Sequence, residues 1–169
     1  MSTTVAVKDW IKRIADDERS RDAVRIREDQ MAARKADLVQ SHGRRLLNEL
    51  RATIARDVEA FRDEFAGEPA RDIVIEATTS DGGLVVRKPA PSPVSLTVAP
   101  KLEAATIVCR YRFTLDGGLP PREARIDVVF ADDVDGKVQM KHSGTGQVFA
   151  TADVLSEFLL VPVFTGRPR

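Results

Sequence analysis

The chain has 169 residues, and its 26 basic residues balance its 26 acidic residues, so the formal net charge is zero. Zero net charge gives no electrostatic reason to expect binding to nucleic acid or to an anionic membrane. A single cysteine excludes an internal disulfide and a cluster of cysteine metal ligands. The start of the chain lacks the pattern of a signal peptide, and the longest apolar run, 158–164, is too short to span a membrane. We therefore expect a soluble, cytoplasmic protein.

The first third of the chain has the composition of one long helix. Before residue 67 there is no proline and only one glycine, Gly43, and Gly67 with Pro69 then forms a typical helix stop signal. A helix of this extent would have about 60 residues and be roughly 90 Å long, which is more than a compact domain normally contains. Because the apolar pattern changes phase at 41–43, we expect either a hinge or a continuous helix kinked near Gly43, and we favour the continuous helix.

Residues 1–43 are predicted to form a charged helical arm with a poor heptad repeat. Apolar residues recur every seven positions from Val24. A coiled coil needs a second apolar position in each heptad to complete the line of contact between the helices, which we call the seam, but Arg21, Glu28 and Lys35 fill these positions. Three interpretations stay open: a solvated helix, a marginal coiled coil with a second copy, and a helix that docks on another protein. If the arm binds a partner, we expect the contact to involve Trp10, Ile14, Val24, Met31 and Leu38.

Residues 44–66 carry the strongest helical signal in the chain. Six apolar residues recur there at spacings of three and four: Leu47, Leu50, Ile54, Val58, Phe61 and Phe65. On a helix they would occupy an arc of about 80°. Burying each side chain contributes roughly 1.5–3 kcal/mol, which exceeds any difference in helix propensity. We expect this helix to cover the apolar face of a sheet.

Between residues 72 and 150, six or seven short runs alternate apolar and polar residues, as β-strands do. The clearest runs are 106–115 and 122–130, separated by the turn signal Asp116-Gly117-Gly118. One apolar and one polar face on each strand predict an antiparallel, curved sheet with helices packed on one face. A last helix is predicted over 151–161, with Thr151 as its N-cap and Pro162 as its end. The fold class is therefore α+β, with an arm at 1–43 and an α+β domain at 44–169.

Basic residues gather on the polar face of the two central strands. Arg110, Arg112 and Arg125 share that face with Glu123 and Asp127. We interpret them first as solvated cross-strand charge pairs, and second as a surface for an acidic partner. The neighbouring aromatic residues point to the other face, so the stripe lacks a platform for stacking nucleic-acid bases.

No pattern in the sequence predicts a catalytic, cofactor or metal site. Neither His42 nor His142 has a neighbour at the spacing of a metal site or a catalytic triad. The acidic run at 132–136 resembles half of a calcium loop, but it lacks the distal glutamate and suits a hairpin turn better. Cys109 falls on the apolar face, where a thiol is usually an inert core residue. We therefore expect no enzyme activity.

The leading functional hypothesis is a non-enzymatic interaction or assembly module. In this hypothesis the arm brings copies of the chain together or docks on another protein, without nucleic acid or membrane. The alternative is a small domain that binds an apolar ligand between the curved sheet and its covering helix. That cavity would be lined by Ile107, Tyr111, Phe113, Ile126, Val128 and Met140.

Overall fold

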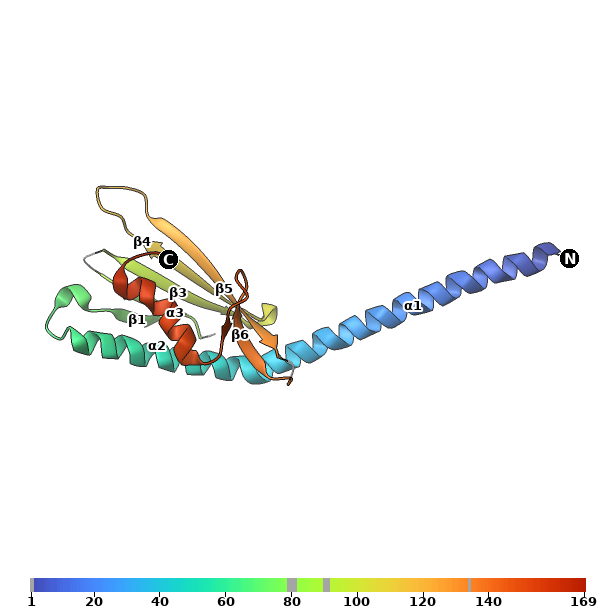
Figure 1. Ribbon diagram of the computed structural model, residues 1–169, viewed down its shortest axis with the longest axis horizontal. Helices are drawn as coiled ribbons and strands as arrows, with labels where there is room; N and C mark the ends of the chain where they lie inside the picture. The colour runs from blue at the N-terminus through green and yellow to red at the C-terminus, as the bar shows by residue number, and fades with distance from the viewer. Residues whose placement is uncertain (1, 79–81, 90–91, 134) are drawn as a thin grey trace. The chain divides into compact units, whose positions relative to one another are not determined.

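A computed structural model describes residues 2–78, 82–89, 92–133 and 135–169 (Figure 1). The chain divides into two compact units, one ending at Asp37 and the other beginning at Leu38. The first unit is helical, and the second combines helices with an antiparallel sheet. The predicted α+β fold class is confirmed.

The N-terminal helical region is unbroken from Ser2 to Glu64. Helix α1 spans Ser2–Leu38, a π-helical turn covers Val39–Gly43, and helix α2 spans Arg44–Glu64. The predicted continuous helix is thus confirmed, and the wider π-helical turn explains why the apolar pattern changes phase there. A methyl group on Gly43 would lie 3.2 Å from Val39 Cγ1 and 3.6 Å from Leu102. Glycine therefore permits close packing at this turn.

The described residues form seven strands, within the predicted six or seven, and these pair antiparallel in chain order. They are β1 Val74–Ala77, β2 Leu84–Lys88, β3 Val94–Lys101, β4 Thr106–Phe113, β5 Arg122–Asp132, β6 Val138–His142 and β7 Val148–Phe149. Short 3-10 turns occur at Pro69–Arg71 and Leu102–Ala104. The sequence also predicts a turn at Asp81-Gly82-Gly83 and a stiff connector containing Pro89, Pro91 and Pro93, of which Asp81 and Pro91 lie outside the described residues.

One face of the sheet, which we call the apolar face, is covered by α2 and α3 (Figure 1). The first four residues of the predicted α2 stripe, from Leu47 to Val58, are at most 2% exposed. Phe61 and Phe65 are only half-buried, and the Phe61 ring stacks on Phe164 with a centroid distance of 4.1 Å. The predicted role of 44–66 as the covering helix is confirmed.

Helix α3 spans Ala152–Thr165 and begins as predicted, because the backbone amide of Val154 donates to Thr151 Oγ1 over 3.3 Å. The prediction that Pro162 ends the helix, at residue 161, is wrong. The helix continues to Thr165, and Gly166 follows it with a φ of 69°. Pro162 and Val163 are both buried in the core, and this burial favours continuing the helix past the proline.

Candidate functional site

Four of the five residues predicted to contact a partner lie on the surface of α1. Trp10, Ile14 and Val24 are 47–52% exposed, and Met31 is 67% exposed. The fifth, Leu38, is half-buried and belongs to the second unit. Ile26 is also exposed, at 54%, but it lies away from the heptad seam, which is why the repeat does not single it out.

The charged residues of α1 pair with one another at short range. Exposed ion pairs join Asp16 to Arg19, Glu18 to Arg21 and Asp22 to Arg25, with separations of 2.9–3.1 Å. Such solvent-exposed pairs contribute little to stability. The apolar side chains of α1 are therefore the part of this helix that gains most from being covered.

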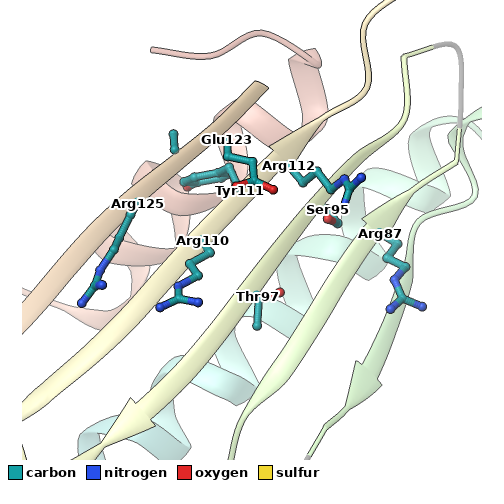
Figure 2. Close-up of a pocket in the computed structure, with 9 residues that line it drawn as sticks. Arg87, Ser95, Thr97, Arg110, Tyr111, Arg112, Glu123 and Arg125 are labelled. Atoms are coloured by element: carbon teal, nitrogen blue, oxygen red, sulfur yellow. The ribbon is translucent and has the colours of Figure 1, made fainter. Parts of the chain in front are cut away.

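The second candidate surface is a hollow of about 710 Å³ on the polar face of the sheet, opposite α2 and α3 (Figure 2). Strand pairing sets its side chains in two rows across the sheet. In one row Thr97 faces Arg110, which faces Arg125. In the other, Ser95 lies between Arg87 and Arg112, and Arg112 also faces Glu123. Among the described residues, four arginines and one carboxylate, that of Glu123, line the hollow.

Two of the four arginines in the hollow are paired with carboxylates. Arg125 donates two hydrogen bonds to Asp127, of 2.8 and 3.1 Å, and these bonds raise the pKa of Arg125. Arg87 donates a 2.8 Å hydrogen bond to Glu76. Within the described part of the chain, Arg110 and Arg112 have no carboxylate within 4 Å.

Alternation along the strands predicted the common face of Arg110, Arg112 and Arg125, and that prediction is confirmed. The sequence pattern does not identify Arg87, Ser95 and Thr97 as neighbours of these arginines. These three residues alternate with buried residues, which indicates that they lie on the polar face. Which residues lie beside them, however, depends on how β2, β3 and β4 pair. The alternating pattern at 137–142 also predicts that Lys137 and Lys141 extend this face, but neither residue lines the hollow.

The apolar face holds most of the residues predicted to line a ligand cavity. Ile107, Tyr111, Phe113 and Val128 are at most 3% exposed in the core, and Ile126 packs against it. Met140 alone of the six lines a hollow of about 450 Å³, which lies between α2 and the strands β6 and β7. The apolar-ligand hypothesis stays a prediction.

The cysteine and the two histidines lie apart from both candidate surfaces. Cys109 is fully buried, and burial raises the pKa of its thiol to about 12, so the thiol is a core residue as predicted. His142 Nδ1 accepts hydrogen bonds from the backbone amides of Gly144 and Thr145, at 2.9 and 3.1 Å. His42 is half-buried in the π-helical turn.

The acidic run at 132–136 forms a turn, as predicted. The Asp133 carboxylate accepts hydrogen bonds from the backbone amides of Asp135 and Lys137, at 2.8 and 2.9 Å. Gly136 closes the turn with a φ of 76°. Val134, in the same run, lies outside the described residues. Among the residues that the structure describes, no three His, Cys, Asp or Glu side chains gather closely enough to hold a metal ion.

Comparison with known proteins finds no matching family model, no similar curated protein and no similar solved structure. None of the described helices combines the length and the apolar composition needed to cross a membrane.

Proposed function

We propose that this protein is a non-enzymatic assembly module, in which helix α1 pairs with α1 of a second copy. The observation that supports the proposal is the row of half-exposed apolar side chains on α1, which includes Trp10, Ile14, Val24 and Met31. Covering the exposed half of each side chain contributes about 1 kcal/mol, or about 8 kcal/mol for two copies. This gain is similar to the cost of association, so we expect a weak dimer whose population depends on concentration.

The charged seam positions favour an antiparallel pair. In a parallel pair, Arg21, Glu28 and Lys35 would each face the same residue of the second copy across the seam. In an antiparallel pair with Ile14 facing Val24 of the second copy, Asp17 faces Arg21 instead. The flanking Arg13 then approaches Arg27 of the second copy, but solvent screens that exposed pair more than a pair within the seam.

Sedimentation velocity of the full chain, over a range of concentrations up to several hundred micromolar, tests the proposal. We expect the average sedimentation coefficient to rise with concentration. The variant Ile14→Glu should sediment as a monomer, because it places a charge in the contact. Ile26→Glu is the matched control, because Ile26 is equally exposed but lies off the seam.

Two results would contradict this proposal. One is a wild-type chain that stays monomeric at every concentration. The other is an Ile14→Glu variant that associates as strongly as the wild type, because the association would then use another surface. Circular dichroism of each variant establishes that the helices are retained.

A further inference from the structure

We propose that the hollow on the polar face of the sheet binds an extended segment of another protein that carries acidic side chains at alternate positions. This inference uses the second unit alone and does not depend on how α1 assembles. The hollow has one feature that the stability of the sheet does not explain. Arg110 and Arg125 lie directly opposite each other on β4 and β5, and like charges at opposite positions destabilise an antiparallel pair.

The charges in the hollow are incompletely neutralised. The Asp127 carboxylate pairs with Arg125, whereas Arg110 lacks a carboxylate partner among the described residues. Figure 2 shows Arg110 and Arg125 side by side, extending in the same direction from the sheet. A carboxylate brought to this pair would reduce the repulsion and gain charge-assisted hydrogen bonds. Arginine suits this role because its planar guanidinium can bind both oxygens of a carboxylate.

The spacing of the unpaired arginines indicates the form of the ligand. Arg110 and Arg112 are two residues apart on β4, so their Cα atoms are separated by about 7 Å. Each has a hydroxyl group opposite it on β3, Thr97 for Arg110 and Ser95 for Arg112. A strand-like peptide repeats its side chains on one face at the same interval of about 7 Å. Acidic residues at every second position would therefore meet both arginine–hydroxyl pairs.

The shape of the surface favours a peptide over a single small anion. A second hollow, of about 310 Å³, shares Arg87, Ser95 and Arg112 with the first. The two together extend the hollowed surface across the strands from β1 to β5, which is more than one anionic group can cover. At its β1 end the second hollow adds Val74 and the carboxylate of Glu76, which is already paired with Arg87.

Nucleic acid fits the same surface less well. The rings of Tyr111 and Phe113 are buried on the apolar face, where they stack with a centroid distance of 5.7 Å. The Tyr111 hydroxyl is also engaged, because it donates a 2.6 Å hydrogen bond to the carbonyl oxygen of Leu159. Bases on the polar face would thus lack these two rings as stacking partners.

Fluorescence anisotropy with the full chain tests the inference. The probe is a labelled peptide of eight residues in which glutamate and serine alternate. We expect saturable binding that weakens as salt rises, and a loss of at least tenfold in affinity in the double variant Arg110→Ala, Arg112→Ala. The matched control is Arg44→Ala, Arg122→Ala, which removes the same charge from exposed positions outside the hollow.

Three competitors identify the ligand chemistry. A peptide with four glutamates followed by four serines should bind more weakly than the alternating peptide. An eight-nucleotide oligothymidylate and pyrophosphate should also compete less well. The inference is overturned if the double variant binds like the control variant, or if the oligonucleotide or pyrophosphate competes better than the alternating peptide. Urea unfolding of both double variants separates lost binding from lost folding.

Discussion

The Arg169 side chain contacts both the backbone carbonyl and the aromatic ring of Phe158. Arg169 Nη2 donates a 3.0 Å hydrogen bond to the Phe158 carbonyl oxygen, and its guanidinium carbon lies 4.1 Å from the centroid of the Phe158 ring. In a regular helix, the backbone amide of residue 162 would donate to this carbonyl, but proline lacks that hydrogen. Arg169 therefore supplies the donor that Pro162 removes from α3.

The variant Arg169→Ala should be less stable than the wild type. It loses a charged donor to the Phe158 carbonyl and a cation–π contact, together worth about 1–2 kcal/mol in the free energy of unfolding. Urea unfolding followed by circular dichroism measures the change. Arg167→Ala is the control, because the Arg167 side chain makes neither contact. Equal unfolding midpoints for the two variants would show that Arg169 does not support the helix.

In α3, local sequence signals decide where the helix begins but not where it ends. Local signals placed the N-cap at Thr151 correctly, because the cap depends only on neighbouring residues. The same local reasoning ended the helix at Pro162, and it failed because Val163 and the proline itself are buried against the sheet. The strands were predictable because alternation fixes which face each residue takes.

The basic hollow was predictable only in part, for a related reason. Alternation along β4 and β5 places Arg110 and Arg125 on one face, but it does not say which residues lie opposite each other. That depends on the pairing register of the two strands, which the loop between them helps to set. The size of the hollow depends further on the shape of the whole sheet, which no short stretch of sequence determines.

Cys109 should make the protein less stable at alkaline pH. Burial raises the pKa of its thiol from 9.0 to about 12, so between these values the unfolded chain ionises while the folded chain keeps its proton. The stabilising contribution is complete below about pH 9 and falls by roughly 1.4 kcal/mol for each pH unit above it. Tyr111, whose pKa is also raised by burial, acts in the same direction.

The variant Cys109→Ala separates the contribution of the thiol to the pH dependence of stability from the contribution of Tyr111. We expect the variant to be less stable than the wild type at pH 7, because the smaller side chain leaves a cavity. Between pH 9 and 11, however, its free energy of unfolding should fall less steeply than that of the wild type. Urea unfolding at several pH values measures both slopes, and parallel slopes would contradict the prediction.

Gly82 should tolerate a methyl group poorly. Its φ is +95°, and an added Cβ would lie 3.0 Å from Leu47 Cδ2 in the core. Both the backbone strain and the close contact oppose Gly82→Ala, so we expect a loss of about 2–3 kcal/mol in the free energy of unfolding. Gly117→Ala is the control, because Gly117 has a φ of +74° but nothing within 4 Å of the added atom. A loss at Gly82 no larger than at Gly117 would exclude the contact as a cause.

Replacing Arg110 by threonine should stabilise the folded protein. The change removes a positive charge opposite Arg125 and places threonine opposite Thr97, which is a favourable cross-strand pair. The matched variant Arg112→Thr should not stabilise the protein, because Arg112 faces the opposite charge of Glu123. Urea midpoints at low salt compare the two variants. A midpoint for Arg110→Thr at or below that of Arg112→Thr would mean that the opposed arginines cost nothing.

The antiparallel arrangement of α1 predicts a specific pattern of disulfide cross-links. In that arrangement Ile14 of one copy faces Val24 of the other, so an equimolar mixture of Ile14→Cys and Val24→Cys chains should form a mixed dimer on mild oxidation. Each variant alone should cross-link poorly, because identical residues lie on different layers of the seam. The native Cys109 is buried and does not compete. Non-reducing electrophoresis separates the products, and mass spectrometry identifies the linked residues. A parallel pair would give the reverse result, with strong cross-linking of each variant to itself.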